Sequence, residues 1–134
     1  MSNHYHALVW LDHREAKVFH FNATESEHVV VKSTHHGEHI HHHANSGDSG
    51  HVPVDHAYLE KVAHEIASAG AILVAGPGNA RKELMSYLES RNPALAAKVT
   101  GLEAADHPTD GELLAHARKF FHADDRMHSQ IHPR

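Results

Sequence analysis

The 134 residues suffice for one domain and leave little room for two. Apolar residues make up 40% of the chain and charged residues 22%, a globular balance that excludes a disordered or collagen-like chain. The absence of cysteine excludes a disulfide framework, a thiolate zinc finger, an iron–sulfur cluster and a cysteine nucleophile. Lysine and arginine number 12 against 17 acidic residues, which argues against a nucleic-acid surface that is basic at every pH. The formal charge of -5 counts all 19 histidines as neutral, so mild acidity near pH ~6.5 would change its sign.

No segment has the pattern of a membrane helix or a secretory signal. The longest uninterrupted apolar run, residues 71–75, is far shorter than the ~20 residues that a membrane-spanning helix needs. Residues 1–9 carry no basic region ahead of an apolar stretch. We therefore expect a soluble, cytoplasmic protein without a membrane partner.

Two β-type runs, residues 5–11 and 16–22, flank a short polar segment and predict a β-hairpin. Pairing across the turn places Val9 near Val18. Both faces of the hairpin are then largely apolar, so we expect helices rather than water on each side of the sheet. A third strand is predicted over residues 28–32.

The composition changes at residues 33–51 to histidine, glycine, serine, asparagine and aspartate. This segment predicts a long His-rich loop. Loops of this length are uncommon in a compact domain and are often functional or disordered.

The second half of the chain alternates helical and strand patterns. The predicted elements are a helix opening near Asp55, a buried strand over 71–75, a helix over 80–90, a strand over 98–103 and a last helix up to residue 122. Thr109 and Glu112 match the Ser/Thr-x-x-Glu capping box at the start of the last helix. Residues 123–134 form a polar tail that we expect to fray.

Three strands followed by alternating helices and strands (βββαβαβα) predict an α/β fold. An antiparallel hairpin region leads into parallel βαβ units, which gives a mixed five-stranded sheet in a three-layer α/β/α arrangement. We expect a single domain over residues 1–122.

The segment Ala71–Leu84 (AILVAGPGNARKEL) resembles the strand, loop and helix of the central domain of archaeal and eukaryotic peptide-chain release factors and of Pelota, the ribosome-rescue protein. Over nearly its whole length the chain resembles a family of small bacterial stand-alone versions of that domain, labelled translational machinery proteins. The segment Asp106–Gly111 (DHPTDG) and the His-rich loop fit the same family. The resemblance implies a ribonuclease H-like three-layer fold, shared with some ribosomal proteins, and a role around the ribosome.

The loop after the third strand departs from the release-factor pattern. In release factors it carries Gly-Gly-Gln, which promotes peptidyl-tRNA hydrolysis. Here the loop His35–His51 contains no glutamine, and the single glutamine of the chain is Gln130. The resemblance therefore implies a domain that docks without hydrolysis, as in the Pelota interpretation, and it assigns no catalytic residue.

Six of the nine residues from His35 to His43 are histidines. Neutral imidazole binds divalent transition metals such as Zn and Ni, so the loop is a candidate metal site that residues near the next helix could complete. The candidate ligands are His35, His36, His39, His41, His42, His43, His51 and His56.

Three interpretations of this cluster remain open. The first is a solvated tract that binds metal opportunistically. The second is a defined Zn or Ni site. The third is an acid-sensitive patch that binds phosphates only when its histidines are protonated. No cofactor is required, because the predicted core closes without the loop.

Two further sets of residues bear on partners and chemistry. If the protein associates with ribosomes, Arg81, Lys82 and Arg91 on the exposed side of the second helix are candidate contacts to ribosomal RNA phosphates. A ribonuclease H-like fold can also hold Mg between carboxylates, which would support nuclease chemistry. The carboxylates near strand ends are Asp12, Glu103, Asp106 and Asp110, and their predicted alignment is poor.

The sequence therefore favours a non-catalytic, translation-associated binding protein whose partner is the ribosome or its RNA. The alternative is a metal-binding or metal- and pH-sensing protein that uses the His-rich loop. A divalent-metal-dependent nuclease is the third interpretation. The oligomeric state is not indicated.

Overall fold

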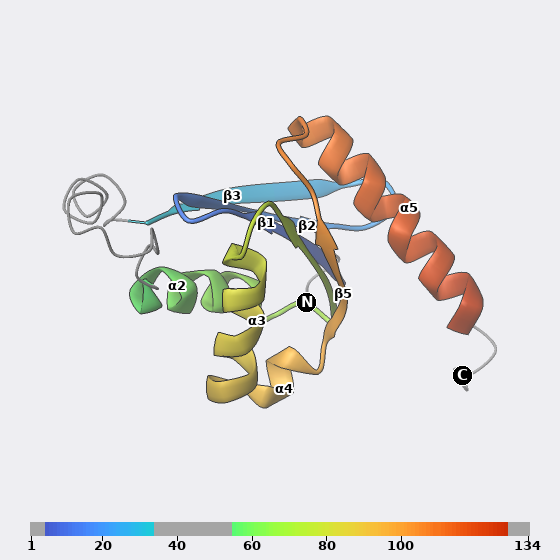
Figure 1. Cartoon of the computed structure of the whole chain (residues 1–134). Coiled ribbons are helices and arrows are strands. Elements are labelled where there is room, and N and C mark those ends of the chain that lie inside the picture. Colours follow the sequence, from blue (N-terminus) through green and yellow to red (C-terminus); the bar gives the residue numbers. More distant parts are fainter. Residues whose placement is uncertain (1–4, 34–54, 129–134) are drawn as a thin grey trace.

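The computed structural model describes residues 5–33 and 55–128. In chain order their elements are β1 (His6–Leu11), β2 (Glu15–Phe21), β3 (Ser26–Lys32), α2 (His56–Ile66), β4 (Ala71–Gly76), α3 (Ala80–Arg91), α4 (Pro93–Ala96), β5 (Val99–Ala104) and α5 (Asp110–His128) (Figure 1). This order matches the predicted βββαβαβα pattern, with the short helix α4 added before β5. Pro93 at the first position of α4 and the Asn92 side chain, which accepts a hydrogen bond from the Leu95 amide at 3.2 Å, explain the added turn of helix.

The strands form one mixed sheet in the order β3-β2-β1-β4-β5. β1 and β3 pair antiparallel with β2, whereas β4 pairs parallel with β1 and β5. Val9 lies opposite Val18, so the predicted hairpin register is confirmed. β3 begins at Ser26, ahead of the predicted start at residue 28, because it pairs with β2 along its whole length. The α/β fold class with a five-stranded mixed sheet is thus confirmed.

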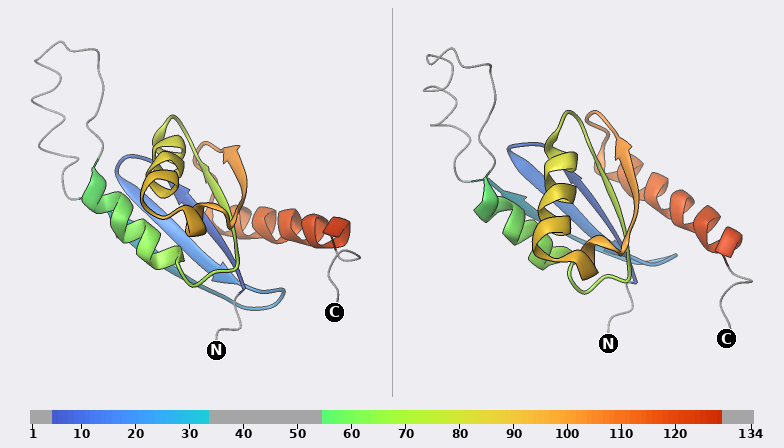
Figure 2. Two further views of the ribbon diagram at one scale, coloured as in Figure 1. Left: turned by 90° about the horizontal axis from the view of Figure 1, so that it is seen from below. Right: turned by 60° about the horizontal axis from the view of Figure 1, so that its bottom comes forward.

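Helices cover both faces of the sheet, as the apolar hairpin predicts (Figures 1 and 2). α2, α3 and α4 lie on one side and α5 on the other. Successive strand residues point to opposite faces, so Ile72 joins the first core and its neighbour Leu73 the second. Both side chains are fully buried.

The two cores differ in composition. The α2 side is mainly aliphatic, with buried residues that include Val9, Val18, Val62, Ile66, Ile72, Val74, Leu84 and Leu88. The α5 side is rich in aromatic residues, with Trp10, Phe19, Phe21 and Phe121 packed around Leu73. We call these the aliphatic side and the aromatic side.

The last helix starts as predicted but runs further. The Thr109 amide donates to the Glu112 carboxylate at 2.9 Å, and the Glu112 amide donates to the Thr109 hydroxyl at 3.1 Å, so the capping box is formed. α5 then continues to His128, into the segment 123–134 that was expected as a frayed tail. The reason is that neither glycine nor proline interrupts the chain between Glu112 and His128. No helix of the described residues is long and apolar enough to cross a membrane.

Candidate functional site

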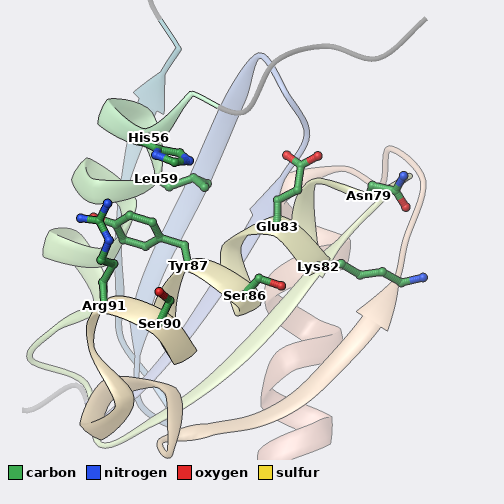
Figure 3. A pocket seen from close by; sticks show the side chains of 9 residues that line it. All are labelled: His56, Leu59, Asn79, Lys82, Glu83, Ser86, Tyr87, Ser90 and Arg91. Atoms are coloured by element: carbon green, nitrogen blue, oxygen red, sulfur yellow. The ribbon is translucent and has the colours of Figure 1, made fainter. Parts of the chain in front are cut away.

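A groove runs between α2 and α3 on the aliphatic side (Figure 3). Its volume is about 480 Å³. The lining residues are His56 and Leu59 from α2, with Asn79, Lys82, Glu83, Ser86, Tyr87, Ser90 and Arg91 from α3 and its N-cap. The groove brings together Lys82 and Arg91, two of the three predicted phosphate contacts, with His56, one of the predicted metal ligands.

Helical periodicity explains why α3 presents these side chains together. Residues four positions apart lie on one face of a helix. Ala80, Leu84 and Leu88 form the buried row of α3 and fix its orientation against the sheet. Two neighbouring rows then face the groove, one formed by Lys82, Ser86 and Ser90 and the other by Glu83, Tyr87 and Arg91.

Tyr87 lies between an imidazole and a guanidinium. Its ring centroid is 6.2 Å from that of His56, with an angle of 56° between the planes. The Arg91 Cζ atom lies 5.5 Å from the Tyr87 centroid, within the range of a cation–π contact. Tyr87 is half-buried and packs against the aliphatic core, so it is a fixed platform beside the exposed His56.

The groove is locally positive although the chain is not. Glu83, the one carboxylate among the lining residues that the structure describes, lies 3.0 Å from the Nε2 atom of His13 in the β1–β2 turn and is engaged there. Lys82 makes no hydrogen bond or ion pair within residues 5–33 and 55–128, and Arg91 makes no ion pair in the same ranges. Both cations are exposed. They are therefore available to an anionic ligand.

Arg81, the third predicted phosphate contact, has a different role from Lys82 and Arg91. It donates from one terminal nitrogen to the carbonyl oxygens of Gly76 and Gly78, at 2.9 and 2.6 Å. It thereby holds the strand-to-helix turn that positions the start of α3. Gly76 is required in this turn, since its φ is +153° and an added Cβ would lie 2.1 Å from the Leu11 carbonyl oxygen. Arg81 is absent from the lining of the groove.

Of the eight predicted metal ligands, His56 is the one that the structure describes. His35, His36, His39, His41, His42, His43 and His51 lie outside the described residues. Metal binding by that segment stays a prediction. His56 lies at the start of α2 with its ring toward Tyr87. Elsewhere among the described residues, no group of three or more His, Asp or Glu side chains is arranged to hold a metal ion.

The residues that flank segment 34–54 are joined to each other. The Ser33 hydroxyl donates to one oxygen of Asp55 at 2.7 Å, and the other Asp55 oxygen accepts from the Tyr58 amide at 3.0 Å, which caps α2. The Ser33 amide also donates to the Arg14 carbonyl at 2.9 Å. These bonds fix the start of α2, and with it His56, relative to the sheet.

Tyr58 joins α2 to the hairpin turn. Its hydroxyl donates to the Asp12 carbonyl oxygen at 2.9 Å. Burial raises the pKa of Tyr58 well above its ordinary value, and the carboxylates of Asp12, Glu15 and Asp55 raise it further. The hydroxyl therefore stays protonated and remains a donor, which keeps the α2 wall of the groove in place.

The four carboxylates considered for nuclease chemistry lie against different basic side chains, except that Asp12 and Asp106 share His107. Asp12 lies 3.7 Å from His107 Nε2, and Asp106 lies 3.1 Å from His107 Nδ1. Glu103 lies 2.7 Å from His116, and Asp110 lies 2.9 Å from Lys17. The four carboxylates do not converge as the acidic residues of a two-metal site would. The described geometry agrees with the poor alignment that the sequence predicts for them.

Several groove residues were missed by reasoning from the sequence. Ser86 and Ser90 follow Lys82 at spacings of four, so helical periodicity alone could have placed them on the same row. The spacing of Tyr87 with Leu84 and Leu88 predicts only a place on the buried stripe of α3. Its contact with His56 joins two helices that are far apart in the chain, and no local pattern signals it.

No family model and no curated protein matches the sequence. Solved structures do resemble the fold. Archaeoglobus fulgidus Pelota aligns with a TM-score of 0.60 at 13% identity, over 88% of this chain and 32% of that chain. Thermoplasma acidophilum Pelota aligns with a TM-score of 0.60 at 19% identity, over 85% of this chain and 33% of that chain. The archaeal translation termination factor aRF1 aligns with a TM-score of 0.56 at 14% identity, over 93% of this chain and 41% of that chain.

These likenesses concern the fold. The chain spans about a third of the length of the two Pelota proteins. Identities of 13 to 19% in these three alignments carry no residue roles across. The described part of the chain has a release-factor- and Pelota-like α/β fold.

Proposed function

We propose that this chain is a translation-associated binding domain that docks on ribosomal RNA through the groove between α2 and α3. The observation that carries the proposal is the pair of exposed cations in this groove, Lys82 and Arg91, which have no carboxylate partner in the described structure. The fold supports the setting, since its structural neighbours include Pelota proteins and a translation termination factor.

The charge distribution favours docking by a few local contacts. Acidic residues outnumber lysine and arginine in the chain as a whole, so a broad basic field is lacking. Two phosphate contacts by Lys82 and Arg91 would give a modest salt dependence, with log affinity falling against log salt at a slope of about -1.4 to -1.8. Weak, salt-sensitive association is therefore expected.

The proposed role is binding without peptidyl-tRNA hydrolysis. The loop that carries Gly-Gly-Gln in the resembled release factors has no glutamine here. In the groove, Glu83 is engaged by His13, and the two serines lie on a helix surface without an adjacent base among the described side chains. We assign no catalytic residue.

Co-sedimentation of the purified chain with ribosomes tests the proposal. We expect the wild type to sediment with ribosomes and the double variant Lys82→Glu/Arg91→Glu to lose about tenfold or more in affinity, since each reversed charge replaces an attraction to phosphate by a repulsion. The matched control is Lys61→Glu/Lys119→Glu, which makes the same change in net charge at exposed positions outside the groove.

The control decides how a loss is interpreted. If both double variants lose affinity equally, net charge and not the groove governs association, and the proposal is wrong. It is also wrong if neither variant affects sedimentation. Circular dichroism melting of both variants verifies that each is folded.

A further inference from the structure

The α2–α3 groove has separate features for the separate parts of a nucleotide. We propose that it binds an unpaired stretch of RNA, with one base between the rings of His56 and Tyr87 and two phosphates of the same strand on Lys82 and Arg91. This inference rests on the proposed function, because it names the form of RNA that the docking groove recognises.

The positions of the two cations require a ligand with more than one anionic group. Lys82 and Arg91 stand nine residues apart on α3, which corresponds to ~13 Å along the helix axis. Figure 3 shows their side chains at opposite ends of the groove, directed away from each other. A single phosphate cannot reach both, whereas two phosphates of one strand that are two or more nucleotides apart can.

The middle of the groove is uncharged apart from the engaged Glu83. Ser86 and Ser90 offer hydroxyls, and Leu59 forms an apolar patch beside the ring of Tyr87 (Figure 3). A ribose carries hydroxyls and a base carries an apolar face, so both parts of a nucleoside find complementary groups between the two cations.

The two rings are nearly far enough apart to enclose a base. Stacked bases are separated by ~3.4 Å, so a base held between two rings needs them ~6.8 Å apart and close to parallel. The His56 and Tyr87 centroids are 6.2 Å apart at an angle of 56°. Tyr87 is fixed by the core and by Arg91, whereas His56 is exposed and can turn its side chain. A small outward movement of His56 therefore opens the space.

The need for a free base face excludes a regular duplex. In double-stranded RNA the bases are stacked inside the helix, and side chains reach mainly phosphates and 2′-hydroxyls. In single strands the bases are free to stack on aromatic side chains, a contact that tolerates any base. An acidic peptide would satisfy the two cations but would leave the two rings without a partner.

The test measures fluorescence anisotropy of labelled oligo(A) and of the oligo(A)·oligo(U) duplex with the full chain. We expect the single strand to bind more tightly than the duplex, and His56→Ala and Tyr87→Leu each to weaken single-strand binding by about tenfold. His56→Phe should retain wild-type affinity, because it keeps a ring and removes only the imidazole nitrogens. His56 is exposed, so its variants carry the test even if Tyr87→Leu fails to fold.

The outcomes separate this inference from the proposed function. If Lys82→Glu/Arg91→Glu weakens binding but His56→Ala and Tyr87→Leu do not, the docking groove stands and the base site is overturned. If none of these variants affects binding, both are overturned. Equal loss in His56→Phe and His56→Ala would show that the imidazole nitrogens are needed, which overturns the stacking site. Competition by a polyglutamate peptide, with no effect of the ring substitutions, would assign the groove to acidic protein segments instead.

Discussion

On the aromatic side of the sheet α5 is the one helix of the described residues that covers the core, and several of its polar side chains hold it in place. Arg118 donates to the carbonyl oxygens of Asn22 and Glu25 in the β2–β3 turn, at 3.0 and 3.2 Å. His116 contacts Glu103 of β5, and Asp110 pairs with Lys17 of β2. On the aliphatic side α2 and α3 share the cover, and the row Lys82, Ser86 and Ser90 has no hydrogen-bond partner in the described residues.

The two sides of the sheet differ in how their helices are held, and this difference explains why the candidate site lies between α2 and α3. A lone helix has only its own side chains and those of the strands to fix its position, so several of its polar side chains, such as Arg118, His116 and Asp110, are bound to the sheet and its turns. Two adjacent helices are fixed by their own packing and by bonds at their ends, such as the one from Tyr58 to Asp12. The polar row of α3 beside the groove between them is therefore free for a ligand.

The largest effect on stability should come from placing a carboxylate in either core. Leu73→Asp on the aromatic side and Ile72→Asp on the aliphatic side should each prevent folding, because an unpaired buried carboxylate costs several kcal/mol, comparable to the whole stability. Leu102→Asp is the matched control, since this leucine of β5 is 43% exposed and should tolerate the change. Circular dichroism and solubility report the result. A folded Leu73→Asp would show that α5 does not close a true core.

The second-largest effect should be a loss of stability at alkaline pH, through the hydrogen bond from Tyr58 to Asp12 that holds α2. The raised pKa of Tyr58 means that its hydroxyl stays protonated in the fold, whereas in the unfolded chain it ionises near pH ~10. Its contribution is complete below pH ~10 and is lost as the pH rises further, by about 1.4 kcal/mol per pH unit. Urea unfolding of the wild type and Tyr58→Phe between pH ~9 and ~11 should show the steeper decline in the wild type. Parallel declines would contradict the assignment.

Removing the hydrogen bonds by which Arg118 holds α5 against the β2–β3 turn should have a smaller effect on stability. Arg118→Ala removes the charged donor from the part-buried Asn22 carbonyl and the exposed Glu25 carbonyl, and we expect the free energy of unfolding to fall by about 1–3 kcal/mol. The exposed neighbour Lys119→Ala should change it by less than about 0.5 kcal/mol. Urea denaturation compares the two variants directly. Equal effects would mean that the bonds of Arg118 do not hold α5.

The smallest effects are expected in the groove. Lys82→Ala should leave the free energy of unfolding unchanged within about 0.5 kcal/mol, because Lys82 has no partner in the described structure. Arg91→Ala should lower it by about 0.5–1 kcal/mol through the lost contact with Tyr87. A loss above these values for Lys82→Ala in thermal or urea unfolding would assign this residue to the fold and not to a ligand.

The sequence by itself determined the elements, because their signals are local. Two β-type runs around a polar turn predicted the hairpin and its Val9–Val18 register, and the bonds between Thr109 and Glu112 form within a single helical turn. The buried strand β4 followed from its unbroken apolar run. The resemblance of Ala71–Leu84 to the release-factor domain led to the observed fold class, since the same strand, turn and helix are present here.

Only the tertiary structure decided which of these residues share a site. The sequence predicted all three cations on the exposed side of α3, yet Arg81 is bound to the Gly76–Gly78 turn while Lys82 and Arg91 line the groove. The pairing of His56 with Tyr87 depends on how α2 and α3 pack on the sheet, and the contact of Glu83 with His13 depends on where the distant hairpin turn lies. Hydrophobic periodicity encodes which face of each element is buried, whereas the contacts between exposed faces depend on the relative placement of separate elements, and no single segment encodes that placement.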